Sequence, residues 1–411
     1  MAIINMKKIS IRPVPFRAAW HNLRYWDYYL LIPYLLLCLT GIVMVYSASA
    51  GIEMQNGGSP RGYLIKQTLY AVLGCGCVFF FANLAMRYLR TRRFLKYSTF
   101  IMFGLLAIVL VVGRAVNGAK GWLSLGPINI QPAEFCKLYF ILYLADRMAR
   151  ARQRGTHFLD SSAAVGPLMF AAIFLILILL QPDTGGFAIN LAIIIVMLLA
   201  CDFKWGYGIA IIVGGPTILY FLLEKAVESG LFHGGYRAQR FIAFMNPFGN
   251  ASGSGSQLVN SYYAISNGGI FGVGLGNSIQ KMGYLPEPNT DFIMSIASEE
   301  LGLVGVSLIL GLLLCLICRI ILVGVRSRLL YQTLICYGTA TFMMVETFFN
   351  IGGVLGLLPI TGVTFPFISY GGSSMLVLSS AVGIVMNISI QQNKEQLQMG
   401  QPFLSAEGSG N

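Results

Sequence analysis

The segment YLPEPNTDF, from Tyr284 to Phe292, places two prolines and two carboxylates in a chain that is 56% hydrophobic and 11% charged. Thr290 is positioned to cap a following helix, which would put Asp291 in the first helical turn. The helix dipole favours an ionised carboxylate there, and the prolines fix the backbone that aims it. An ionised carboxylate can accept a proton. Acid–base chemistry and simple helix capping are therefore the two roles open to Asp291.

A second group of charged residues lies in the segment from Asn117 to Lys137. Lys120 and Trp122 fall where a membrane interface is expected, and an interface anchor is the simpler role for Trp122. Glu134 and Lys137 are three residues apart, so they share one face of a helix and can pair. A charged pair at the end of an apolar span is costly unless it has partners or faces water. The pair therefore predicts a functional site.

Two further irregular segments carry polar residues. Asp183 stands in the turn QPDTGG, and Ser369 and Gly371 stand in GLLPITGVTFPFISYGGSS, which is rich in proline and glycine. Backbone that is not helical is tolerated at membrane depth where it lines a cavity rather than lipid. We therefore expect these segments and the two above to surround one cavity on one side of a membrane.

The elements that must position these residues are membrane spans. The mean hydropathy of +0.71 and the few charges are typical of a chain whose solvent is mostly lipid. Runs of about 17 to 25 apolar residues can cross the hydrocarbon core. About ten such helices are predicted, and two of them, Ala133 to Ala149 and Leu329 to Ile351, contain charged residues. The others are Tyr28 to Ala50, Gln67 to Met86, Tyr97 to Gly113, Ser161 to Pro182, Thr184 to Cys201, Trp205 to Leu223, Leu301 to Cys318 and Gly371 to Gln391.

The distribution of basic residues predicts the orientation of these spans. Most of the 28 Lys and Arg residues lie in the N-terminal tail and in the turns on one side of the membrane. Cytoplasmic loops carry such an excess, so both termini are expected in the cytoplasm. The net charge of +12 is then mainly a topology signal, and no nucleic-acid binding is expected. The predicted organisation is a basic tail at 1–27, an all-α membrane domain at 28–391 and a second tail at 392–411.

The connection at 224–300, between the seventh and eighth predicted spans, is much longer than the others. A long connection in a compact chain is usually functional. We expect it outside the cytoplasm, with a short amphipathic or re-entrant helix, then a glycine-rich turn, then the segment that carries Asp291. Gly272, Gly274 and Gly276 in that turn suit either contact with a phosphate or close helix packing.

The eight cysteines fall in or beside the spans, which excludes the disulfide framework of a secreted protein. Their CGC and CLIC spacings resemble metal sites, but the chain has only three His and none lies nearby. We therefore expect small core residues at these positions. No cofactor is predicted with certainty, and a divalent cation, Mg²⁺ or Mn²⁺, is the alternative.

Several motifs occur together in the order and spacing of one known family. They are GAKGWL, QPAEFCK, QPDTGG, NPFGN, NGGIFGVGLGNSIQKMGYLPEPNTDFI, EELGLVG and GLLPITGVTFPFISYGGSS. On these motifs the chain resembles the SEDS family of shape, elongation, division and sporulation proteins, from about Tyr28 to Gln391. MVYSASA and QLVNSYYAISNGG are more similar to its division branch than to its elongation branch.

The resemblance implies a peptidoglycan glycosyltransferase that polymerises lipid II during septal synthesis, at the outer face of the bacterial cytoplasmic membrane. It also implies a class B penicillin-binding protein transpeptidase and other division proteins as partners. Asp291 corresponds to the family's essential aspartate and is expected to be the general base of an inverting transfer. Asn289 stands where the family commonly has His, so this chain must work without that side chain.

The resemblance further implies the residues that contact substrate. Glu134 and Lys137 correspond to the family's Glu and Lys pair, and Lys120 and Trp122 correspond to its loop Lys and Trp. From the chemistry of the reaction, the candidates to stabilise the leaving pyrophosphate are Lys120, Lys137, Arg237, Arg240 and Lys281. The full set of candidates is Lys120, Trp122, Glu134, Lys137, Asp183, Arg237, Arg240, Lys281, Glu287, Ser369 and Gly371.

Two other functions fit the same composition. A flippase for the same lipid-linked precursor would show a polar path through the membrane and inverted repeats. A non-enzymatic scaffold of the division machinery would need only interaction surfaces. The polar segments gather on one side and no repeat is visible in the sequence, which favours the polymerase.

Overall fold

The computed structural model describes residues 22–55, 57–59, 61–116, 119–125, 128–159, 164–201, 236–250, 253 and 255–398. Seven helices in these ranges are long and apolar enough to cross a bilayer, as expected for a polytopic membrane protein. They are α2 (Tyr28–Gln55), α3 (Arg61–Asn83), α5 (Arg92–Val112), α8 (Thr184–Cys201), α13 (Ile293–Val325), α14 (Leu330–Val354) and α15 (Gly372–Gln398).

Two more predicted spans are present as helices with a different character. Helix α6 (Pro132–Gln153) keeps charged residues among its buried positions, and α7 (Val165–Leu180) is apolar but has only 16 residues. The predicted span from Trp205 to Leu223 and the beginning of the long connection lie outside the described residues. The tenth predicted helix is thus neither confirmed nor contradicted.

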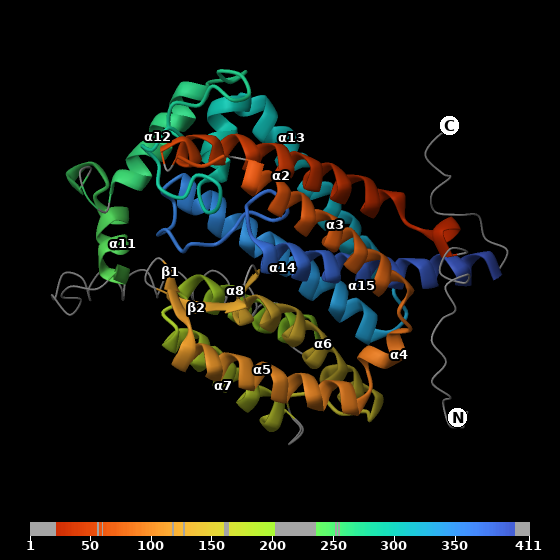
Figure 1. The fold of residues 1–411 in the computed structure, drawn as a ribbon. Helices are drawn as coiled ribbons and strands as arrows, with labels where there is room; N and C mark the ends of the chain where they lie inside the picture. The colour runs from red at the N-terminus through yellow and green to blue at the C-terminus, as the bar shows by residue number, and fades with distance from the viewer. Residues whose placement is uncertain are drawn as a thin grey trace.

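Helix α15 forms the centre of the bundle. Nearly all of its apolar stretch is buried, and it packs along α3 and against α6 and α14. Helix α5 lies at the margin, where Phe100 and Val111 are exposed. Exposed large apolar side chains on a membrane-length helix are suited to contact with lipid tails. Figure 1 shows α2 and α3 beside α13 and α15, with α5 to α8 forming the other side.

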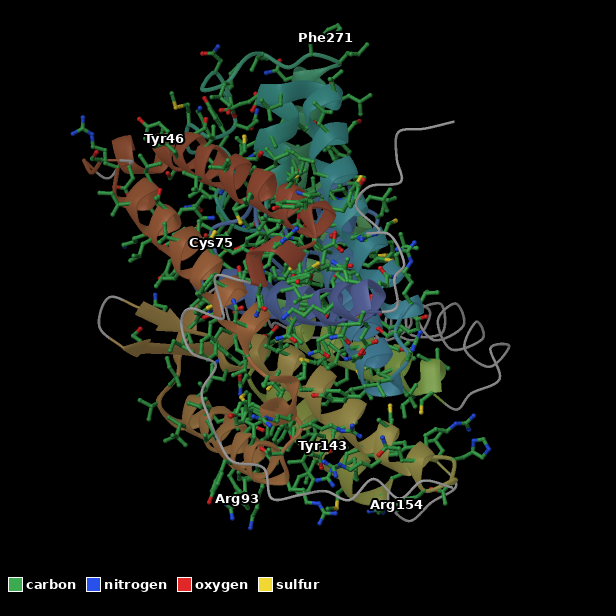
Figure 2. All side chains as sticks on the ribbon, turned by 90° about the vertical axis from the view of Figure 1, so that its right-hand side faces the viewer. Tyr46, Cys75, Arg93, Tyr143, Arg154 and Phe271 are labelled. Carbon is green, nitrogen blue, oxygen red and sulfur yellow. The ribbon has the colours of Figure 1, made fainter. Side chains whose placement is uncertain are left out.

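The two ends of the bundle differ in what they carry. Figure 1 shows α11 (Tyr236–Met245) and α12 (Ser256–Gly268) at one end and the short helix α4 (Met86–Leu89) at the other. In Figure 2, Arg93 and Arg154 project at the end opposite Phe271. Single 3-10 turns, η1 (Leu23–Tyr25) and η3 (Phe248–Asn250), complete the described elements.

The connection between α5 and α6 forms a small antiparallel sheet, which the sequence analysis did not predict. Its strands are β1 (Arg114–Val116), β2 (Ala119–Leu125) and β3 (Ile128–Ile130), in the order β1-β2-β3. Arg114 pairs with Trp122, and Leu123 pairs with Ile130. Pro132 then starts α6, a position where the missing amide hydrogen of proline is harmless. The chain is therefore all-α only in its membrane part.

Helix α13 begins at Ile293, eight residues before the predicted start at Leu301. The prediction was wrong because Glu299 and Glu300 resemble the polar end of a loop, whereas the structure buries both carboxylates inside the first helical turns. The helix bends at Gly302, whose φ is 67°. A positive φ of this kind is readily adopted only by glycine.

The glycine-rich turn packs directly on this bend. The amides of Val273 and Leu303 donate to the carbonyls of Glu299 and Gly269, at 2.9 and 3.0 Å. A Cβ added to Gly272 would come within 2.2 Å of the carbonyl oxygen of Glu300. The glycines thus allow two stretches of backbone to approach closely, which favours packing over the predicted alternative of phosphate contact.

Candidate active site

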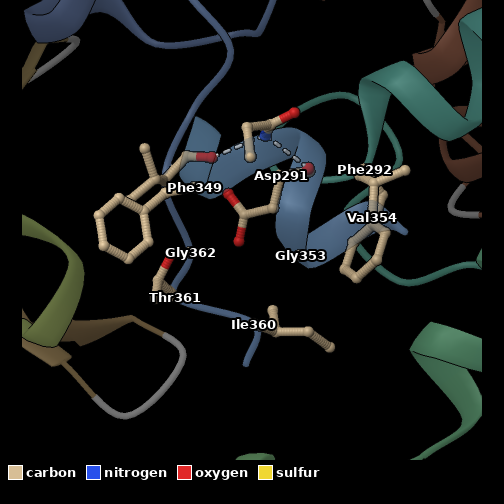
Figure 3. A pocket seen from close by; sticks show the side chains of 10 residues that line it. Asp291, Phe292, Phe349, Gly353, Val354, Ile360, Thr361 and Gly362 are labelled. Atoms are coloured by element: carbon tan, nitrogen blue, oxygen red, sulfur yellow. Dashed lines mark hydrogen bonds between the residues drawn. The ribbon is translucent and has the colours of Figure 1, made fainter. Parts of the chain in front are cut away.

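Asp291 lies at a small hollow at the end of the bundle that carries α11 and α12. Figure 3 shows its carboxylate pointing into the space bordered by Phe349, Ile360 and Thr361. The complete lining is Asp291, Phe292, Phe349, Asn350, Gly353, Val354, Ile360, Thr361, Gly362 and Val363. Asn350 and Thr361 are the polar side chains that line the hollow beside Asp291, and the other lining residues are apolar or glycine.

The loop that carries Asp291 is held by hydrogen bonds to its main chain. Asn350 of α14 donates through Nδ2 to the carbonyl oxygen of Asp291, at 2.8 Å. Ser369 Oγ donates to the carbonyl of Thr290 at 2.7 Å, and the Tyr370 amide donates to the carbonyl of Asn289 at 2.8 Å. Three consecutive carbonyls are therefore fixed by residues from α14 and the connection that follows it.

Burial raises the pKa of Asp291 to about 6. The positive charge of Arg240 lowers this pKa, and the negative charge of Glu287 raises it. A carboxyl with a pKa near 6 is mostly ionised at neutral pH and is a stronger base than an ordinary aspartate. This is the property that a general base needs.

Arg240 of α11 brings a positive charge to the same hollow. Its Nη1 donates to the carbonyl oxygen of Ile360 at 3.1 Å. A Cβ added to Gly362, whose φ is 76°, would lie 3.4 Å from both Arg240 Nη1 and Asp291 Oδ2. The guanidinium and the carboxylate therefore both lie beside Gly362, where a side chain would contact each of them.

Glu287 lies next to this pair and has an unusual backbone. Its φ of 54° is in the left-handed region that non-glycine residues rarely adopt. Its Oε2 accepts a hydrogen bond from Thr290 Oγ1 at 3.1 Å. The prediction that Thr290 caps the next helix is thus wrong, since Phe292 occupies the N-cap position of α13 without a side-chain cap. Strained backbone of this kind is frequent at functional sites.

Glu134 and Lys137 form a buried cluster that includes a third residue. Lys137 Nζ lies 2.6 Å from Glu134 Oε1 and 2.5 Å from Glu346 Oε1, and the lysine is 1% exposed. The predicted pairing is present. The expectation that Lys137 contacts the pyrophosphate is corrected, because its ammonium is enclosed between two carboxylates of α6 and α14.

Lys281 has a comparable position elsewhere. Its Nζ lies 2.6 Å from Glu300 Oε1 and donates to Ser47 Oγ at 3.0 Å, and the side chain is 2% exposed. The neighbouring Glu299 accepts hydrogen bonds from Asn267 and Ser278. The expected contact between Lys281 and the pyrophosphate is corrected for the same reason. Lys281 joins the glycine-rich connection to α2 and α13.

Asp183 caps helix α8. Its Oδ1 accepts from the Gly186 amide at 2.7 Å, and its Oδ2 accepts from Gln131 Nε2 at 3.1 Å. Burial raises the pKa of Asp183, and the bond from Gly186 lowers it. Gly185, two residues further along, packs against Thr361 and Val363 of the hollow. Asp183 therefore supports the wall of the hollow from behind.

The remaining predicted residues are distributed unevenly. Ser369 bonds the Asp291 loop as described above, and Gly371 packs against Thr364 and Ser374 just before α15. Trp122 is half-buried in β2. The side chains of Lys120 in β2 and Arg237 in α11 lie outside what the structure describes, so their contacts stay predictions.

Sequence reasoning missed Asn350, Ile360, Thr361 and Gly362, which complete the hollow. A signal for Asn350 existed, because a polar residue inside a span predicts a specific partner. The three other residues belong to a segment whose irregular backbone was recognised, but the sequence did not show which of its positions face Asp291.

No group of three or more His, Cys, Asp or Glu side chains is placed to hold a metal ion within the described ranges. All eight cysteines are free; Cys38, Cys136 and Cys336 are buried, as expected of core residues, whereas Cys315 and Cys318 are exposed on α13. The described part of the site presents the carboxylate of Asp291 and the guanidinium of Arg240, and a requirement for Mg²⁺ or Mn²⁺ stays a prediction.

Comparison with known proteins shows which family the chain belongs to. The family model described as "Cell cycle protein", which covers FtsW, RodA and SpoVE, matches residues 28–394. The chain belongs to this family. A Bacillus subtilis protein named "Probable peptidoglycan glycosyltransferase FtsW" is 38% identical over 90% of this chain and 91% of its own. A Lactococcus lactis protein with the same name is 36% identical over 90% and 94%.

Solved structures show the same fold. A chain from "Structural coordination of polymerization and crosslinking by a peptidoglycan synthase complex" matches with a TM-score of 0.69 and 27% identity, over 89% of this chain and 97% of that one. RodA, the rod shape determining protein of Thermus thermophilus, matches with a TM-score of 0.61 and 27% identity, over 89% and 96%. The SEDS resemblance predicted from motifs is confirmed.

Proposed function

We propose that the protein is a peptidoglycan glycosyltransferase that polymerises lipid II into glycan strands during septal cell-wall synthesis. The observation that carries the proposal is the carboxylate of Asp291, held by its main chain at a mostly apolar hollow, with Arg240 beside the same Gly362. The names of the FtsW relatives support the same reaction class.

In the proposed reaction, a sugar hydroxyl of one glycan attacks the anomeric carbon of another, which is bonded to a polyprenyl pyrophosphate. A new glycosidic C–O bond forms as the C–O bond to the pyrophosphate breaks, and the configuration at that carbon inverts. Asp291 takes the hydroxyl proton, and the pyrophosphate leaves with the bonding electron pair. A positioned base contributes about 10²- to 10⁴-fold to such a rate.

The leaving pyrophosphate gains negative charge, which a preorganised cation stabilises. Arg240 is the described side chain best placed for this role, because its guanidinium lies beside Gly362, as the Asp291 carboxylate does. Lys120 and Arg237 stay candidates for further contacts with the pyrophosphate. A Mg²⁺ or Mn²⁺ ion that arrives with the substrate is an alternative source of the same charge.

The proposed setting is the bacterial cytoplasmic membrane, with the hollow on the extracytoplasmic side. The basic residues Arg93 and Arg154 at the opposite end support this orientation. The proposed partner is a class B penicillin-binding protein, together with other division proteins. Its support is the fold shared with a chain of a complex that coordinates polymerization and crosslinking.

The test is glycan formation from lipid II by the purified protein, with and without the cognate class B penicillin-binding protein. Wild type is expected to make polymer, and Asp291→Asn should lose at least about 10²-fold in rate while it still folds and binds its partner. Glu53→Gln, which changes a half-buried carboxylate of α2 on the same side of the molecule, is the matched control and should keep its activity.

Equal polymer from wild type and Asp291→Asn would refute the role of Asp291 as the base. No polymer from wild type, even with the partner, would refute the glycosyltransferase. That second result would favour the flippase or the scaffold.

A further inference from the structure

Asn350 is a buried polar residue on helix α14, with 4% of its surface exposed. Its carboxamide nitrogen donates both of its hydrogens. One goes to the carbonyl oxygen of Asp291 and the other to the carbonyl oxygen of Val363, each at 2.8 Å, as the dashed lines in Figure 3 show. A single side chain therefore joins two segments that are far apart in the sequence.

These two segments form opposite walls of the hollow. Asp291 belongs to the loop before α13, and Val363 belongs to the connection between α14 and α15. The amide group is planar and its two N–H bonds have a fixed angle, so it sets the separation of the two carbonyls. Ser369 and Tyr370 fix the preceding carbonyls at Thr290 and Asn289, and only Asn350 holds Asp291 itself among the described residues.

We propose that Asn350 is the positioning residue of the site, which holds Asp291 at a fixed distance from the wall formed by residues 360–363. The inference rests on the proposed function and extends it. Asn350 acts through the main chain of Asp291 and not as a catalytic group. Its two donor hydrogens are the feature that matters, so a side chain of similar size without them should not replace it.

The position of Asp291 also determines which charged groups it meets. Arg240 faces it from α11, while Glu287 and Thr290 face it from its own loop. The apolar side chains of Phe349 and Ile360 line the hollow beside it. Without the bond from Asn350, the carboxyl can move toward solvent, and its pKa should fall from about 6 toward the ordinary value of an aspartate. The acidic limb of the rate profile would then move to lower pH.

The structure offers a matched control for this residue. Asn387 of α15 is 5% exposed, and its nitrogen likewise donates to two carbonyls, those of Phe81 and Leu84, at 2.9 and 2.5 Å. These carbonyls lie at the end of α3 that leads into α4, away from the hollow. Loss of either asparagine removes two comparable buried hydrogen bonds, but only the bonds of Asn350 reach the site.

The experiment compares Asn350→Leu with Asn387→Leu in the full-length protein, together with its penicillin-binding protein partner and lipid II. Both variants should lose a similar amount of thermal stability. Asn350→Leu alone should lower the saturating rate by about 10- to 100-fold, as expected for a small misplacement of a reacting group. It should leave the half-saturating lipid II concentration nearly unchanged and move the acidic limb below pH 6.

Equal losses of rate in the two variants, with an unmoved acidic limb, would overturn the proposal. If Asn350→Leu does not fold, the pair Asn350→Ser and Asn387→Ser asks the same question with a smaller change, and the same two outcomes decide it. No polymer from wild type would refute both the function and this role, whereas an active wild type with equal variants refutes the positioning role alone.

Discussion

The Lys137 cluster and the Asp291 hollow contain the same types of residue in different arrangements. In the cluster, the carboxylates of Glu134 and Glu346 lie 2.6 and 2.5 Å from one ammonium, inside the bundle. In the hollow, Asp291 is held through its carbonyl oxygen, and its carboxylate points into the open space near Arg240. The first arrangement fixes the charged atoms themselves, and the second fixes only the backbone behind them.

This difference separates a structural carboxylate from a reactive one. A carboxylate in short contact with a buried ammonium is stable as an anion, and removal of its partner leaves a buried charge. A carboxylate that is partly desolvated but not locked to a cation can exchange a proton. The contrast between the two regions therefore predicts that mutations in the cluster change stability, whereas mutations at the hollow change rate.

The largest effect is expected in the cluster. Lys137→Met leaves Glu134 and Glu346 without their ammonium, and the free energy of unfolding should fall by about 3–5 kcal/mol. Thermal unfolding in detergent measures this change. Lys394→Met, which removes a half-buried lysine near the surface, is the control and should lose at most about 1 kcal/mol.

A second change refines the comparison within the cluster. Addition of Glu346→Gln to Lys137→Met removes one of the two stranded carboxylates and should recover part of the lost stability. An unaltered melting temperature in Lys137→Met would show that the cluster is not the structural element described here.

The next largest effect is the pH dependence of rate and stability at the Asp291 hollow, which distinguishes it from the Lys137 cluster. Because burial raises the pKa of Asp291 to about 6, the polymerisation rate should fall about tenfold per unit as pH drops below 6 and the base takes up a proton. The same raised pKa means that the folded protein favours the neutral carboxyl. The ionised form therefore lowers stability progressively as pH rises from the ordinary aspartate value through 6.

Asp291→Asn should consequently unfold at a higher temperature than wild type above pH 6, and the difference should vanish in acid where both side chains are neutral. Melting curves at several pH values measure this. A variant that is less stable than wild type at neutral pH would mean that the carboxylate stabilises the fold, as the carboxylates of the Lys137 cluster do.

The smallest effect is expected at Gly362. Gly362→Ala must hold an L-residue at a φ of 76°, which should lower the free energy of unfolding by about 1–2 kcal/mol. Its new methyl group would contact both Arg240 and Asp291. The polymerisation rate should therefore fall by more than the loss of folded protein alone would cause. Gly76→Ala, in open space on α3, should instead gain about 1 kcal/mol. Equal activity of these two variants would argue against a working site at the hollow.

Much of the membrane fold could be predicted from the sequence, because an apolar run of fixed length has few alternatives in a bilayer. The bend of α13 could not, since one glycine in an apolar run gives no sign that its φ will be positive. The sheet at 114–130 was missed because its strands are only three to seven residues long. Short strands depend on their neighbours more than on their own sequence.

The candidate site was predictable where a residue type limits the chemistry and unpredictable where packing decides. Asp291 and Arg240 were both expected at the site, because charged residues are costly in a membrane protein and usually mark a functional site. Lys281 was assigned to the substrate, yet its partners are Glu300 and Ser47, which lie 19 and 234 residues away. Only the folded structure shows that the ammonium group of such a lysine is already bonded to other side chains of the protein.

The pairing of the glycine-rich turn with the bend of α13 has a consequence for the segment between them. The hydrogen bonds of Val273 and Leu303 tie the two ends of this segment together, so the chain that carries Asp291 forms a closed loop. Closure of such a loop reduces its conformational entropy before any ligand arrives. The exposed side chains of Met282 and Tyr284 in this loop can therefore accept substitutions during evolution, while the buried Lys281 and Leu285 and the two paired ends keep Asp291 in place.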